Sequence, residues 1–218
     1  PKYRTAPQAL TFIYGFLLFE WGGLTRFVWV LARYPRQEQM EQNRAIQFWW
    51  AQGLLDMGQK LYKLRIEVSG KDALKGNTAL LLSRHSSMGD TALPLLFFGK
   101  ARNEGLRYVL KQELQLLPCL DIGGHRLPNV FVDRTGADSA KAVKDVSDLI
   151  ATAGPDESVL IYPEGTRFTQ EKHDQLRAKH PQLEAQLDRW PNLLPLRLGG
   201  VTGMLAANPG KDLVFLAH

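Results

Sequence analysis

The feature that most constrains this chain is a regular alternation of short apolar runs and helical patterns after Leu64. Several of the runs are continuously apolar and rich in valine, isoleucine and leucine, as strands buried on both faces of a sheet are. The expected strands are Leu64–Val68, Thr78–Ser83, Arg107–Leu110, Val130–Val132, Val159–Tyr162, Leu193–Leu198 and Leu213–Leu216. The expected helices between them are Asp90–Lys100, Ala137–Ala153 and Glu171–Leu187. This alternation predicts an α/β fold, a layered and mostly parallel sheet flanked by helices.

The N-terminal part has a different character, because residues 10–32 are almost entirely apolar and aromatic. Glu20 and Arg26 would be costly at the centre of a bilayer. Gly22-Gly23 allows a break between them, so we expect two short apolar helices here, followed by a helix from Gln37 to Lys63. Core helices of a soluble bundle would be an alternative interpretation. The apolar density instead favours an N-terminal membrane-binding element of apolar helices, which spans residues 1–63.

Residues 64–218 then form the α/β domain. The sequence begins at Pro1 and stops inside an apolar run, so we expect the natural chain to continue at both ends and this domain to be truncated at its C-terminus. Cys119 is the only cysteine, which excludes an intramolecular disulfide and a cysteine-based zinc site. The formal net charge of +5 fits nucleic acid, anionic lipid or a phosphorylated small substrate, and does not choose among them.

The expected strand Thr78–Ser83 runs directly into a turn that contains His85 and Asp90. On a regular helix this separation is a rotation of about 140°, so the two side chains would not share a face. In a strand-to-helix turn, however, the chain can fold back so that the carboxylate reaches the imidazole. A carboxylate on one ring nitrogen leaves the other nitrogen as a general base near neutral pH. His85 and Asp90 are therefore candidate catalytic residues, although the spacing alone also fits a structural histidine.

The expected strand Val159–Tyr162 ends in Pro-Glu-Gly-Thr-Arg, residues 163–167. Gly165 permits a turn with exposed backbone N–H groups, and Thr166 and Arg167 supply a hydroxyl and a planar cation. These groups suit an anion, and arginine suits phosphate in particular. Taken alone, the same run also fits a polar surface turn.

Two further strand ends deliver cations, Lys111 after Arg107–Leu110 and Arg134 after Val130–Val132. Ligands of open α/β sheets bind outside the carboxyl ends of the strands. The cations and His85 can therefore converge on one rim of the domain.

In this order, these blocks resemble the glycerolipid acyltransferase family, the lysophosphatidic acid acyltransferases. The first block of that family is His, four residues, then Asp, which His85 and Asp90 match. The other blocks are matched by residues 131–134 (Phe-Val-Asp-Arg), residues 163–167 (Pro-Glu-Gly-Thr-Arg), an apolar stretch around Pro195, and Lys-x-Glu-Leu at residues 111–114. Residues 164–169 and the following Lys172-His173 resemble the branch that acylates lysophosphatidic acid, lysocardiolipin or related lysolipids. That branch usually has basic residues after the proline, whereas residues 196–199 here are Leu-Arg-Leu-Gly, so the headgroup stays open.

The resemblance implies transfer of a fatty acyl group from a thioester, acyl-CoA or acyl-ACP, to the free hydroxyl of a lysophospholipid. His85 would be the general base and Asp90 would orient it. The residues that would bind substrate are Glu164, Gly165, Thr166, Arg167, Arg134 and Lys111. No metal or cofactor is implied. The implied partner is the lipid surface of a membrane, at its cytosolic face, and no nucleic acid.

Three other functions fit parts of the sequence. A non-catalytic lipid-binding protein of the same fold would keep the cations, but the intact pair of His85 and Asp90 argues against it. A hydrolase would use a nucleophile, yet the sequence contains no Gly-x-Ser-x-Gly elbow for Ser86 or Ser87. Nucleic-acid binding rests on net charge alone.

Overall fold

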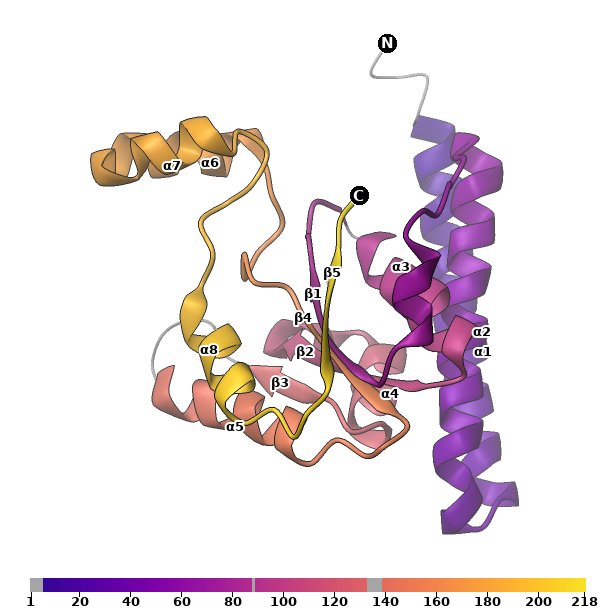
Figure 1. Cartoon of the computed structure of the whole chain (residues 1–218). Helices are drawn as coiled ribbons and strands as arrows, with labels where there is room; N and C mark the ends of the chain where they lie inside the picture. Colours follow the sequence, from indigo (N-terminus) through magenta and orange to yellow (C-terminus); the bar gives the residue numbers. More distant parts are fainter. Residues whose placement is uncertain (1–5, 88, 133–138) are drawn as a thin grey trace.

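A computed structural model describes residues 6–87, 89–132 and 139–218. Its strands form a sheet in the order β3-β2-β4-β1-β5, in which every neighbouring pair is parallel (Figure 1). The strands are β1 (Ala79–Ser83), β2 (Gly105–Lys111), β3 (Val130–Val132), β4 (Glu157–Ile161) and β5 (Asp212–Leu216). Their carboxyl ends share one edge because all run the same way. The predicted α/β fold with a parallel sheet is confirmed.

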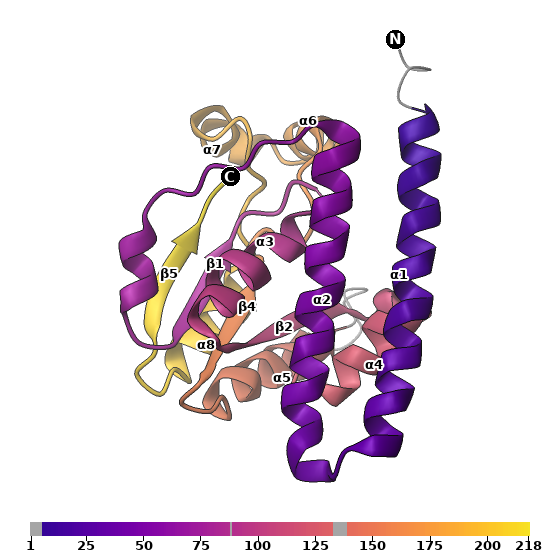
Figure 2. The same cartoon turned by 90° about the vertical axis from the view of Figure 1, so that its right-hand side faces the viewer.

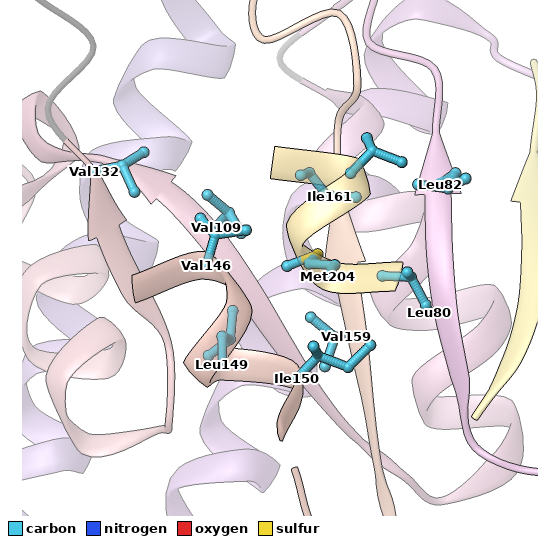
Figure 3. Packing of buried hydrophobic residues seen from close by; sticks show 11 residues of the cluster. Leu80, Leu82, Val109, Val132, Val146, Leu149, Ile150, Val159, Ile161 and Met204 are labelled. Carbon is cyan, nitrogen blue, oxygen red and sulfur yellow. The ribbon is translucent and has the colours of Figure 1, made fainter. Parts of the chain in front are cut away.

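Helices α5 (Ser139–Ala151) and α8 (Leu198–Ala206) cover one face of the sheet. Figure 3 shows their side chains against those of the strands, with Met204 and Ile150 meeting Leu80 and Val159. All of these are completely buried. Burying one such aliphatic side chain contributes about 1.5–3 kcal/mol relative to leaving it exposed, so this layer fixes the sheet beneath the candidate site.

Helix α2 (Arg36–Tyr62) and the helical segment after β1 cover the other face. This segment begins as α3 (Ala92–Pro94) and continues as the π-helical turn η4 (Leu95–Lys100). Helix α1 (Ala6–Arg33) packs antiparallel on α2, outside this layer, and α4 (Pro118–Arg126) lies against both (Figure 2). Short 3₁₀ turns in this half of the chain are η2 (Lys71–Lys75), η3 (Gly89–Thr91) and η5 (Gln112–Leu116).

The prediction of a break at Gly22-Gly23 was wrong, because α1 is one continuous helix of 28 residues. The glycines make room for neighbours instead: a Cβ on Gly23 would lie 2.4 Å from Cys119 Sγ, and one on Gly22 would lie 2.9 Å from the Trp49 ring. Glu20 is buried, and its carboxylate accepts hydrogen bonds from Trp50 Nε1 (3.2 Å) and from the backbone N–H of Cys119 (3.1 Å). Glu20, which was expected to disfavour one continuous helix, therefore attaches that helix to the rest of the protein.

Helix α1 is long and apolar enough to cross a membrane, and only 22% of its most apolar 18-residue window is buried inside the protein. This is the feature of the chain that points to membrane association.

Two expected strands, Leu64–Val68 and Leu193–Leu198, are not strands. The first has no regular secondary structure. In the second, the backbone N–H of Leu194 donates to the Glu164 carboxylate and that of Arg197 to the Pro163 carbonyl. The turn after β4 thus supplies the acceptors that a neighbouring strand would supply in a sheet.

The expected helix Glu171–Leu187 is divided into α6 (Gln170–Lys179) and α7 (Glu184–Arg189) by the 3₁₀ turn η6 (Pro181–Leu183). The proline at the start of η6 explains the division, since proline cannot continue an α-helix. Figures 1 and 2 show α6 and α7 beyond the edge of the sheet at which β1 and β4 end.

Candidate active site

His85 follows the end of β1, and Asp90 lies in η3, so the chain folds back between them. His85 Nδ1 faces Asp90 Oδ2 at 3.6 Å, and both side chains are largely buried. Within the described ranges, Nδ1 is enclosed and has no hydrogen-bond partner, which leaves the carboxylate as the charged group that it faces. A strand-to-helix turn thus brings together two residues that a regular helix would hold on different faces.

Asp90 is held as an anion by the turn itself. The backbone N–H groups of Ser86 and Ser87 each donate to Oδ2 at 2.5 Å, and the Ser87 hydroxyl donates to Oδ1. Burial alone would raise the pKa of Asp90, but the His85 side chain and the hydrogen bonds from Ser87 and Ser86 outweigh it and hold that pKa well below its usual range. The carboxylate is therefore ionised wherever the protein is folded near neutral pH.

Two tyrosines complete the surroundings of this pair. The Tyr162 ring stacks on His85 with centroids 4.4 Å apart and an interplanar angle of 30°. Its hydroxyl donates to the Asp90 carbonyl at 3.4 Å, and the Tyr108 hydroxyl donates to the Thr91 carbonyl at 3.0 Å. Burial raises the pKa of Tyr162, which keeps its hydroxyl neutral. The sequence could have indicated Tyr162, because it lies two residues after the buried Leu160, on the same face of the strand, and directly precedes the turn at residues 163–167.

His218 also reaches this pair from beyond the end of β5. Its Nε2 lies 3.1 Å from Asp90 Oδ1 and 3.0 Å from the Ser86 hydroxyl. No spacing in the sequence indicates this contact, because 132 positions separate His218 from Ser86 and the parallel pairing of β1 with β5 brings them together.

Glu164 is buried, and both of its carboxylate oxygens bind backbone. Oε1 accepts from the N–H of His85 at 3.1 Å, and Oε2 accepts from the N–H of Leu194 at 3.0 Å. The N–H of Phe168 donates to the His85 carbonyl at 2.8 Å. The turn after β4 therefore clamps the histidine on both sides of its backbone, and Glu164 acts as the brace.

The rest of this turn presents polar groups at the surface. Gly165 has a φ of 69°, a left-handed conformation that favours glycine, and its N–H donates to the Tyr162 carbonyl. Thr166 Oγ1 accepts from Lys172 Nζ at 2.9 Å, and the same ammonium donates to the Arg167 carbonyl at 2.8 Å. The Arg167 side chain is exposed.

Lys111 is the last residue of β2, in register with Val132 of β3. Since β4 lies between β2 and β1, the strand ends that carry Lys111, Arg167 and His85 are consecutive along one edge of the sheet. Arg134, the remaining predicted cation, lies outside the described residues.

The family model described as Acyltransferase matches residues 65–195. The match includes the His85 turn, the end of β2 and the turn after β4, which together form the site described above. A comparison with curated proteins found no match. The matched region is more than half of the chain, and the chain therefore belongs to the Acyltransferase family.

Proposed function

We propose that this protein transfers a fatty acyl group from acyl-CoA or acyl-ACP to the free hydroxyl of lysophosphatidic acid or a related lysophospholipid. This is the activity of a 1-acyl-sn-glycerol-3-phosphate O-acyltransferase, a step of phospholipid biosynthesis or remodelling. The observation that carries the proposal is the His85–Asp90 pair at the same sheet edge as Lys111 and Arg167, within a chain of the Acyltransferase family.

In this reaction His85 is the general base. With Nδ1 turned to the Asp90 carboxylate, Nε2 takes the proton of the acceptor hydroxyl. The hydroxyl oxygen attacks the thioester carbonyl, and the carbon–sulfur bond breaks as the ester forms. The thiolate then takes the proton from the imidazolium. Asp90 stabilises the imidazolium between the two proton transfers. The acceptor itself is the nucleophile, so no acyl-enzyme, metal or cofactor is required.

The acceptor phosphate binds among the cations at the strand ends, Arg167 with Lys111 and Arg134, beside the Thr166 hydroxyl. Planar guanidinium groups suit a phosphate because they donate two parallel hydrogen bonds. Gly165 contributes the conformation of the turn. Glu164 contributes by bracing His85, since its carboxylate oxygens already accept from two backbone N–H groups.

The proposal includes a location at a membrane surface, on its cytosolic side, and helix α1 supports the association with a membrane. Exposed apolar residues line this helix at helical spacing: Leu10, Ile13, Tyr14, Leu17, Leu18 and Trp21. Such a stripe suits the interface between headgroups and acyl chains. Residues 1–63 are thus the membrane-associating element, and residues 64–218 hold the chemistry.

The test is detection of labelled acyl transfer from oleoyl-CoA and from oleoyl-ACP to a panel of lysophospholipids, with His85→Ala beside the wild type. Diacyl product from the wild type alone supports the proposal, and the preferred lysolipid identifies the acceptor. His125→Ala is the matched control, because His125 is an exposed histidine on α4 and should retain full activity. Absence of product with both donors, from protein that still binds liposomes, would replace the proposal with a non-catalytic lipid-binding function.

A further inference from the structure

Arg197 follows the apolar block around Pro195 and was not among the predicted substrate-binding residues, yet the structure ties it to the turn after β4. Its backbone N–H donates to the Pro163 carbonyl at 2.8 Å, and the N–H of Leu194 donates to Glu164 Oε2 at 3.0 Å. Two hydrogen bonds thus hold the segment 194–197 along the turn that braces His85. The backbone of Arg197 is therefore placed as firmly as the turn itself.

The side chain of Arg197 crosses this turn at Gly165. A Cβ on Gly165 would lie 2.6 Å from Arg197 Cδ and 3.0 Å from its Nε. The missing side chain of Gly165 consequently lets the arginine lie directly on the turn backbone, beside Thr166 and Arg167. An arginine held in this way has already lost much of the conformational freedom that binding a ligand would cost.

The guanidinium of Arg197 is exposed, and within residues 6–87, 89–132 and 139–218 it has neither an ion pair nor a hydrogen bond. By contrast, three arginines are neutralised within the protein, since Arg102 pairs with Glu104, Arg107 with Glu157 and Arg177 with Asp188. Arg197 lines a hollow of about 260 Å³. The other polar residues of this hollow are Thr166, His180 and Glu164, whose carboxylate oxygens already accept from two backbone N–H groups. Its apolar walls are Leu176, Leu183, Leu194, Pro195 and Leu196.

We infer that Arg197 binds a phosphate group of a substrate and sets the preference for phosphate-bearing substrates at this site. A planar cation without an ion pair among the described residues, lying on the turn at Gly165 and sharing a hollow with Thr166, can donate two parallel hydrogen bonds to a phosphate. The inference rests on the proposed function, because the hollow adjoins the turn that holds His85. The phosphate belongs either to the acceptor headgroup or to the coenzyme A donor, and these two sources separate in the experiment.

The experiment compares Arg197→Gln and Arg197→Lys with the wild type by steady-state kinetics on mixed vesicles. Lysophosphatidic acid is paired with the phosphate-free acceptor monoacylglycerol, and oleoyl-CoA with the phosphate-free donor oleoyl N-acetylcysteamine thioester. We expect Arg197→Gln to raise the KM of one phosphate-bearing substrate about tenfold while leaving kcat within about twofold. The KM of its phosphate-free counterpart should not change. Arg197→Lys should recover part of the loss, because it keeps the charge but not the planar fork.

The control is Arg189→Gln on α7, whose exposed guanidinium lies over the Trp190 ring. It removes the same charge outside the hollow and should leave every KM unchanged. Equal KM changes for phosphate-bearing and phosphate-free substrates, or no change in either, would overturn the inference while leaving the proposed function intact.

Isothermal titration calorimetry measures the binding of glycerol 3-phosphate and of coenzyme A, and so tests the contact between Arg197 and a phosphate without turnover. A roughly tenfold weaker Kd for one of these probes in Arg197→Gln supports the inference. Unchanged Kd values for both overturn it, even in a protein that transfers no acyl group, so failure of the proposed function is distinguished from failure of this inference.

Discussion

Glu164 holds His85 through the backbone, with its Oε1 accepting from the His85 N–H at 3.1 Å across 79 positions of sequence. Its other oxygen accepts from Leu194, so the carboxylate joins the turn after β1, the turn after β4 and the segment before α8. The sequence hypothesis made Glu164 a substrate ligand. The geometry instead favours a brace, and the two roles differ in what a substitution would change.

Glu164→Gln should lower kcat with little effect on the acceptor KM. The amide offers one acceptor oxygen to two backbone donors, so one buried N–H loses its partner, at about 1–3 kcal/mol. For a chain of this length each kcal/mol lowers Tm by about 2–4 °C. Steady-state kinetics and thermal unfolding measure both effects, with the exposed Glu184→Gln as control. A large rise in acceptor KM at unchanged kcat would return Glu164 to the substrate-binding set.

The lowered pKa of Asp90 predicts how the stability of the fold changes with acid. Because the pKa of Asp90 is lower in the folded state than in the unfolded chain, the unfolded chain binds more protons as the pH falls below the ordinary aspartate pKa, about 3.9. The stabilisation by Asp90 is fully present above that value and is lost as the pH falls toward the folded-state pKa. Urea unfolding at pH 6, 4 and 3 should therefore show a steeper loss of stability in the wild type than in Asp90→Asn. Parallel losses in the two proteins would mean that the turn does not stabilise the carboxylate.

Gly165 and Gly70 form a matched pair for testing the turn after β4. Their φ angles are 69° and 70°, but a Cβ on Gly70 meets nothing within 4 Å, whereas one on Gly165 meets Arg197. Gly70→Ala should cost about 1–2 kcal/mol from backbone conformation alone. Gly165→Ala should cost more, because the Arg197 side chain must also move. Denaturant unfolding compares the two, and equal costs would show that Arg197 does not rest on the turn.

The apolar stripe of α1 should drive binding to liposomes. Leu17→Glu and Trp21→Glu each replace an exposed apolar side chain on this helix, so folding should be little affected. Each should weaken liposome binding about tenfold or more, since burying a large apolar side chain is worth about 1.5–3 kcal/mol. Co-sedimentation with lipid vesicles measures this. Phe215→Glu on the edge strand β5 is the control, and an equal loss there would mean that α1 is not the membrane-binding surface.

The sequence by itself determined the strands β1 to β5 and the edge at which the site lies, although it also predicted two strands that do not form. Apolar runs such as Val159–Tyr162 predict buried strands because the strand period and the need to bury both faces are local properties of the chain. The His85–Asp90 pair was also predictable, since one turn contains both residues and its polar groups fold back on themselves. These features need no knowledge of distant neighbours.

Features that depend on residues far apart in the sequence were decided only by the tertiary structure. Helix α1 is unbroken at Gly22-Gly23 because Cys119 and Trp49 fill the space that the glycines leave. The segment Leu193–Leu198 is no strand because Glu164 and Pro163 satisfy its backbone. Hydrogen-bond partners and packing neighbours far along the chain leave no periodic trace in sequence, and that is why the brace at Glu164, the ring on His85 and the position of Arg197 emerge only in the folded protein.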